Sequence, residues 1–108
     1  MLACCAGTAV AAPLTVRQIQ VSSTHTHHYV CRDGKTLDVT YMNTKNGQSF
    51  ALLSVDARTL LFVNVLSASG AKYAADHFTW WTRGPTGTLT DDTASSSTQP
   101  LFAECKSG

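Results

Sequence analysis

TLDVTYMN, residues 36–43, alternates apolar and polar side chains with the two-residue period of a half-buried β-strand. The apolar face of this segment consists of Leu37, Val39 and Tyr41. The dipeptide DG precedes the segment at 33–34, and NG follows it at 46–47. Both dipeptides are typical of tight turns between antiparallel strands. The segment therefore predicts a strand that continues into hairpins on both sides.

The rest of the chain repeats this pattern of short apolar runs and turns. Further strands are predicted at SFALLSV (49–55), TLLFVNVL (59–66), HFTWWTR (77–83), GTLT (87–90) and LFAEC (101–105). Gly84-Pro85 joins one hairpin, and the polar stretch 91–100 predicts a solvated loop. Because no stretch has the length and 3.6-residue period of a helix, we expect an all-β fold. A small antiparallel β-barrel is the architecture we expect, since closure removes exposed strand edges.

Length and charge limit the function classes. The chain has 108 residues, of which 44% are hydrophobic and 14% charged, which indicates one folded domain. Its net charge of +1 provides no basic stripe, so we expect no nucleic-acid partner. Affinity for any partner must come mainly from local shape and contacts.

The first residues have the composition of an export signal. MLACCAGTAVAAP (1–13) has no charged side chain and contains an A-x-A processing site at residues 9–11. We interpret residues 1–11 as the remnant of a secretory signal or, through Cys4 or Cys5, of a lipoprotein leader. Residues 12–24 are expected to form a flexible lead-in, and residues 25–108 the barrel domain. The expected location is the periplasm, with the protein either soluble or lipid-anchored to the outer membrane.

Cys31 and Cys105 are the two cysteines outside the leader. An even pair in an exported chain predicts a disulfide, here closing a loop of about 75 residues. Such a crosslink stabilises a fold by at most about 4.5 kcal/mol in the chain-entropy model. Free or metal-bound thiols are the alternative interpretation.

Three other groups of residues suggest competing functions. Ser69, Asp76 and His77 include the residue types of a hydrolytic triad, but no nucleophile-elbow motif surrounds Ser69, so we expect no catalysis. His25 and His27 share one strand face and could bind Zn or Cu, although no further ligand is suitably spaced.

The consecutive tryptophans suggest a third alternative. Trp80 and Trp81 must face opposite sides of a strand, and an outward Trp could bind a sugar. A periplasmic carbohydrate- or peptidoglycan-binding module and a His-cluster metal-binding protein therefore remain as alternatives.

Several short motifs resemble a known protein family. YVCRDG (29–34), SGAKY (69–73) and WWTRG (80–84), followed by a closing Cys105, resemble the bacterial inhibitors of c-type lysozyme. That family has membrane-bound (MliC) and periplasmic (PliC) forms. The resemblance extends from Tyr29 to Cys105, which is most of the chain.

The resemblance implies a fold, a partner and a site. Family members are antiparallel barrels of about eight strands tied by a disulfide, without catalytic activity, cofactor or metal. They insert the serine of the SGxxY loop, together with a basic residue that is usually Lys, into the lysozyme cleft. The implied lysozyme-binding residues are Ser69, Gly70, Lys72, Tyr73 and Arg83. Arg83 stands where the family usually has Lys. The arginine keeps the positive charge but differs in the geometry of its hydrogen-bond donors.

Overall fold

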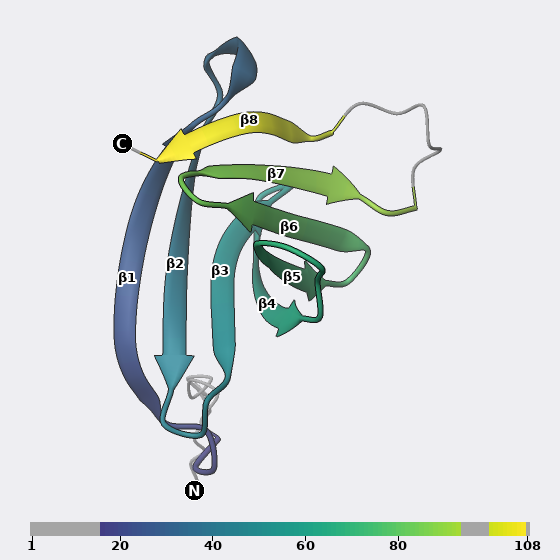
Figure 1. The fold of residues 1–108 in the computed structure, drawn as a ribbon. Helices are drawn as coiled ribbons and strands as arrows, with labels where there is room; N and C mark the ends of the chain where they lie inside the picture. Colours follow the sequence, from purple (N-terminus) through teal and green to yellow (C-terminus); the bar gives the residue numbers. More distant parts are fainter. Residues whose placement is uncertain (1–15, 94–99, 108) are drawn as a thin grey trace, which may run out of the picture.

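Eight antiparallel strands close into a barrel in the computed structural model, which describes residues 16–93 and 100–107 (Figure 1). Each strand pairs with its neighbours in sequence, and the last strand returns to the first. The strands are β1 (Val21–Val30), β2 (Thr36–Thr44), β3 (Ser49–Val55), β4 (Arg58–Val65), β5 (Ala71–Ala75), β6 (Phe78–Arg83), β7 (Thr86–Asp91) and β8 (Phe102–Ser107). A short 3-10 segment, η1 (Arg32–Gly34), connects β1 to β2. The predicted all-β barrel is confirmed.

The observed strands differ from the predicted ones at two places. β1 was not among the predicted strands: it begins at Val21, within the expected lead-in of residues 12–24, and pairs with β2 from there. After Val21 its first residues are polar and mostly exposed, and cross-strand hydrogen bonding rather than burial makes them a strand. β5 was not among the predicted strands. The expected leader (1–11) and most of the expected loop at 91–100 lie outside the described residues. In the described part of the chain, no helix is both long and apolar enough to cross a membrane.

Inward-facing side chains of all strands fill the barrel. The largest fully buried ones are Trp80, Phe62, Phe78, Leu53, Leu89 and Val39. The indole Nε1–H of Trp80 donates a 2.8 Å hydrogen bond to the Tyr41 hydroxyl, which lies 2.8 Å from the Tyr29 hydroxyl. Burial raises the pKa of Tyr41, and the hydrogen bond with Tyr29 raises it further. Tyr41 therefore acts as a neutral hydrogen-bonding group packed against the apolar core.

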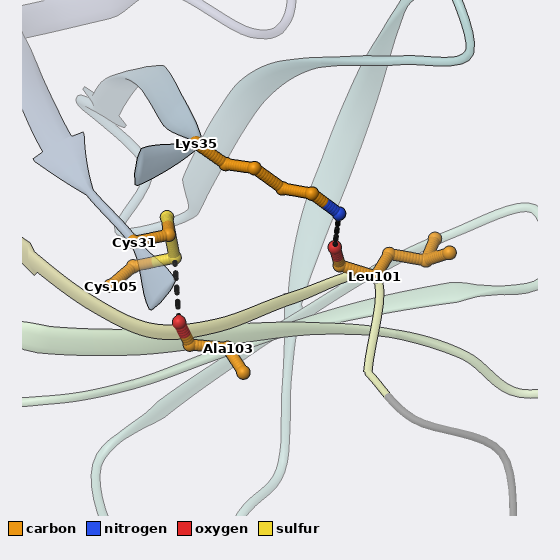
Figure 2. The surroundings of a disulfide bond; sticks show 5 residues. All are labelled: Cys31, Lys35, Leu101, Ala103 and Cys105. Atoms are coloured by element: carbon orange, nitrogen blue, oxygen red, sulfur yellow. Dashed lines mark hydrogen bonds between the residues drawn. A yellow bond between two sulfur atoms is a disulfide. The ribbon is translucent and has the colours of Figure 1, made fainter. Parts of the chain in front are cut away.

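The disulfide Cys31–Cys105 reinforces the seam at which the barrel closes (Figure 2). Only two residue pairs, both at the end of β1, join β1 to β8, compared with nine between β1 and β2. Beside the disulfide, the Lys35 ammonium donates a 3.2 Å hydrogen bond to the Leu101 carbonyl. The crosslink and this hydrogen bond therefore hold the β1–β2 connection against the last strand. The predicted disulfide is confirmed.

Candidate functional site

The loop between β4 and β5 presents Ser69 to solvent. The Ser67 hydroxyl donates hydrogen bonds to the carbonyls of Ser69 and Gly70, at 3.0 and 3.2 Å. The indole Nε1–H of Trp81 donates a further hydrogen bond of 2.9 Å to the Ser69 carbonyl. These contacts use the carbonyl of Ser69, and the residue remains exposed to solvent. Hydrogen bonds to its backbone carbonyls therefore hold the loop in place, and the Ser69 side chain takes no part in them.

Gly70 allows this loop to lie directly against β6. Its φ of +67° is in the left-handed region, which glycine adopts without a steric penalty. A Cβ at this position would lie 2.1 Å from the Thr82 carbonyl oxygen and 3.0 Å from Cγ of Arg83. The absence of a side chain therefore brings the loop that carries Ser69 beside Arg83.

Trp81 contacts both cationic residues of the predicted site. Lys72 on β5 is the cross-strand partner of Trp81, and its ammonium lies 4.5 Å from the ring centroid. Arg83 is two residues along β6 on the same face, and its guanidinium carbon lies 4.4 Å from the ring centroid. Both distances are typical of cation–π contacts. Trp81 is not among the binding residues predicted from the sequence, although its two-residue spacing from Arg83 places the two side chains on one face of a strand.

Four of the five predicted binding residues lie together at this end of the barrel. Ser69, Gly70 and Arg83 are exposed, and Lys72 is half-buried beside Trp81. Tyr73 is the exception, since only 8% of it is exposed and it faces the core between β4 and β6. Burial raises the pKa of its phenol. In this structure Tyr73 therefore anchors β5 in the core, and its contact with a lysozyme stays a prediction.

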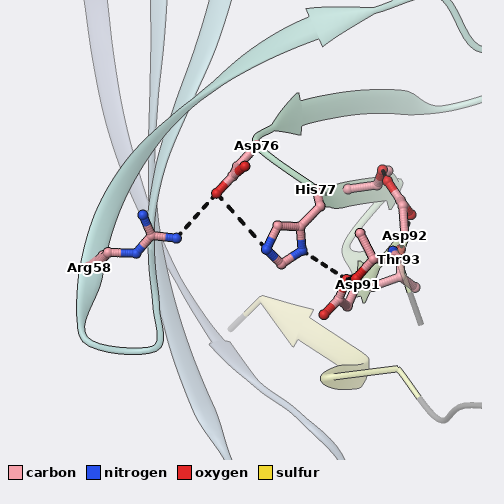
Figure 3. Close-up of polar contacts among 8 residues, drawn as sticks. Arg58, Asp76, His77, Asp91, Asp92 and Thr93 are labelled. Atoms are coloured by element: carbon pink, nitrogen blue, oxygen red, sulfur yellow. Dashed lines mark hydrogen bonds and ion pairs between the residues drawn. The ribbon is translucent and has the colours of Figure 1, made fainter.

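Asp76 and His77 lie at the opposite end of β5 from Ser69, in the turn to β6 (Figure 3). Nδ1 of His77 lies 2.8 Å from a carboxylate oxygen of Asp91, and this contact raises the pKa of the imidazole. Hydrogen bonds from Thr93 to Asp91, followed by the contact with His77, lower the pKa of the carboxylate. The contact between His77 and Asp91 joins the β5–β6 turn to the end of β7, at the opposite end of β5 from Ser69. Ser69, Asp76 and His77 therefore do not form a catalytic triad.

The two binding alternatives find little support in the geometry. Among residues 16–93 and 100–107, no three His, Cys, Asp or Glu side chains gather as a metal site would require. Trp81 faces outward, but Lys72 and Arg83 pack on its ring. A tryptophan with two charged neighbours on its ring is not an open platform for a sugar.

Comparison with known proteins agrees with the resemblance in the motifs. Residues 29–97 match the family model described as the membrane-bound lysozyme inhibitor of c-type lysozyme. A protein of that name from Cupriavidus necator is 36% identical over 104 residues, which cover 96% of this chain and 82% of that protein.

Two solved structures share the barrel. The crystal structure of Pseudomonas aeruginosa MliC in complex with hen egg white lysozyme has a TM-score of 0.68 and 34% identity, covering 94% of this chain and 99% of that one. The periplasmic inhibitor PliC from Salmonella typhimurium has a TM-score of 0.69 and 26% identity, covering 80% of this chain and 99% of that one.

Proposed function

Since this chain belongs to the family of membrane-bound inhibitors of c-type lysozyme, we propose that it inhibits such a lysozyme by inserting Ser69 and Arg83 into the active-site cleft. One observation carries the proposal. The exposed loop of Ser69 packs through Gly70 against the strand that ends in the exposed Arg83, within the region matched to the family. The protein acts by contact and performs no chemical step.

The chemistry of the target explains this choice of side chains. A c-type lysozyme uses two carboxyl groups, a protonated acid in an apolar pocket and an ionised partner. A serine hydroxyl both donates and accepts hydrogen bonds, so it suits the protonated acid. A guanidinium suits the ionised carboxylate, which it binds through two parallel hydrogen bonds. Ser69 and Arg83 therefore complement the two catalytic groups in charge and in hydrogen bonding.

Electrostatics support a contact-driven complex. The net charge of +1 gives no long-range attraction toward a cationic lysozyme, and steering contributes little to association. Local charge is concentrated instead at Lys72 and Arg83, which share one indole ring. This local positive group matches the carboxylates of the cleft.

Cellular location follows from the same proposal. A lysozyme inhibitor acts where peptidoglycan is attacked, which places this protein in the periplasm, soluble or anchored to the outer membrane through Cys4 or Cys5. The membrane-bound relatives and the periplasmic structural neighbour support export. Mass spectrometry of the N-terminal peptide from the membrane fraction tests this, since a diacylglyceryl cysteine and a chain beginning after Ala11 differ in mass.

The test is turbidity loss of a bacterial cell suspension treated with hen egg white lysozyme, with and without the protein. We expect protection by the parent protein, weakened on Ser69→Ala by about 1 kcal/mol of binding free energy. Arg83→Ala should cost more, about 2–5 kcal/mol, because it leaves a desolvated carboxylate without its partner. Arg83→Lys should be mild, since it keeps the charge and restores the residue usual in the family.

Matched control variants lie at the far end of the barrel. Arg58→Ala removes an exposed guanidinium that pairs with Asp76, and Ser54→Ala removes an exposed hydroxyl next to Thr59. Both should inhibit like the parent. No protection by the parent at micromolar concentration would reject lysozyme inhibition. Parent-like inhibition by both Ser69→Ala and Arg83→Ala would reject this binding face.

A further inference from the structure

We propose that Trp81 is the positioning residue of the inhibitory site: it fixes the Ser69 loop, Lys72 and Arg83 relative to one another before lysozyme binds. The proposal rests on the proposed function and adds to it a residue that acts through its neighbours. Three contacts of one indole ring support it, and they join the stretch from Ser69 to Lys72 to β6.

The first contact fixes the loop. Trp81 donates its Nε1–H to the Ser69 carbonyl at 2.9 Å, across twelve residues of sequence. Ser69 follows directly on the segment Ser67–Ala68 and precedes Gly70, whose position against β6 is set by the close approach to Thr82. The loop is therefore held at two adjacent residues, by an indole hydrogen bond and by a steric fit.

The second and third contacts gather the positive charge. The ammonium of Lys72 and the guanidinium of Arg83 lie 4.5 and 4.4 Å from the centroid of the same ring. Two cations repel each other, and without an aromatic ring that both contact their long side chains would spread apart in solvent. The negative face of the indole compensates this repulsion and reduces the number of conformations that each side chain samples.

Preorganisation is the expected consequence. Side chains that are ordered before binding lose less conformational entropy when the complex forms, so the complex is tighter without any additional contact with the partner. Trp81 is half-buried on the outer face, whereas Trp80 next to it fills the core. Substitution of Trp81 therefore changes the site while leaving the core packing intact.

The experiment compares Trp81→Phe and Trp81→Leu with the parent in the hen egg white lysozyme assay. Phe keeps an aromatic face but lacks the donor, and we expect inhibition about fivefold weaker, the effect of one net hydrogen bond. Leu removes both functions, and we expect inhibition about thirtyfold weaker, because two exposed cation–π contacts are lost as well. Phe50→Leu is the matched control, since Phe50 is half-buried on β3 with Val63 as its cross-strand partner. It should inhibit like the parent.

A double-mutant cycle separates positioning from other roles. If Trp81 acts through Arg83, Trp81→Leu should cost clearly less in an Arg83→Ala background than in the parent. Fully multiplicative losses would overturn the proposal, because they indicate either direct contact with lysozyme or a general loss of folded protein. If Trp81→Leu does not fold, Trp81→Phe still decides, and parent-like inhibition by the Phe variant would reject the loop contact.

The outcome is distinguishable from failure of the proposed function. If the parent gives no inhibition, or if Ser69→Ala and Arg83→Ala both inhibit like the parent, the proposed function or its site fails. If those two variants are weakened while Trp81→Leu inhibits like the parent, the site stands and the positioning role of Trp81 is rejected.

Discussion

Gly70→Ala is the perturbation whose consequence follows most directly from the packing of the Ser69 loop. The new Cβ would lie 2.1 Å from the Thr82 carbonyl oxygen, whereas real Cβ atoms essentially never lie closer than 3.0 Å to such a neighbour. The loop and β6 must therefore separate by roughly 1 Å, and overpacking of this kind costs about 1–3 kcal/mol. The φ of +67° adds about 1 kcal/mol, because an alanine is strained in the left-handed region. We expect the free energy of unfolding to fall by about 2–4 kcal/mol.

Gly47→Ala provides the matched control for this prediction. Its φ is +89°, but no atom lies within 4 Å of the position that a Cβ would occupy, so it has the backbone strain without the clash. We expect it to lower the free energy of unfolding by about 1 kcal/mol and to leave inhibition unchanged. Gly70→Ala should weaken inhibition about tenfold or more, because binding constellations tolerate displacements of only about 0.5 Å.

Two measurements check the pair. Denaturant unfolding with the disulfide intact gives the loss of stability, and the lysozyme turbidity assay gives the loss of inhibition. If Gly70→Ala is no less stable than Gly47→Ala and inhibits like the parent, then close packing of the Ser69 loop on β6 does not support the site.

Two further predictions concern the rest of the barrel. Replacing Cys31 and Cys105 together by Ser should lower the free energy of unfolding by up to about 4.5 kcal/mol and so lower the thermal midpoint substantially. Detection of two free thiols in the native parent would contradict this prediction. The contact of His77 with Asp91 should stabilise the fold most between pH values near the ordinary pKa values of the two groups, 3.8 and 6.5. Because the pKa of His77 is raised, its contribution to stability is complete below pH 6.5 and is lost as the pH rises through the raised pKa. Because the pKa of Asp91 is lowered, its contribution to stability is complete above pH 3.8 and is lost as the pH falls through the lowered pKa. The difference in thermal midpoint between the parent and His77→Gln should therefore be largest between pH 3.8 and 6.5 and should shrink as the pH rises through the raised pKa of His77. A difference that does not vary with pH would contradict the pairing.

Much of the barrel could be predicted because its strands bury one face. In β2, the alternation of apolar and polar residues corresponds to buried Leu37 and Val39 and exposed Thr36 and Asp38. The hairpin from β6 to β7 followed from Gly84-Pro85, and Gly84 does adopt a positive φ of 56°. These signals are local in sequence, since the turn residues and the period of two lie within a few positions of each other.

β5 could not be predicted because its strand character is not local. AKYAA contains one buried residue, Tyr73, and alanine and lysine are depleted in strands. Its hydrogen bonding to β4 and β6 makes it a strand, and this depends on partners distant in the sequence. The same limit applies to Tyr73, because the SGAKY motif predicts a binding residue while its burial in the folded barrel is visible only in the structure.

The proximity of the candidate site residues likewise depends on strand pairing between distant parts of the sequence. The motifs identified Ser69 and Arg83, but their separation of fourteen residues gives no reason for proximity. Proximity arises because β5 and β6 form a hairpin, which brings the residue before β5 next to the end of β6. Trp81 then acts across this hairpin, since its ring reaches the Ser69 carbonyl and both cations at once. The two consecutive tryptophans thus divide into a core residue, Trp80, and an outward-facing residue, Trp81, and the way β6 lies in the barrel decides which is which.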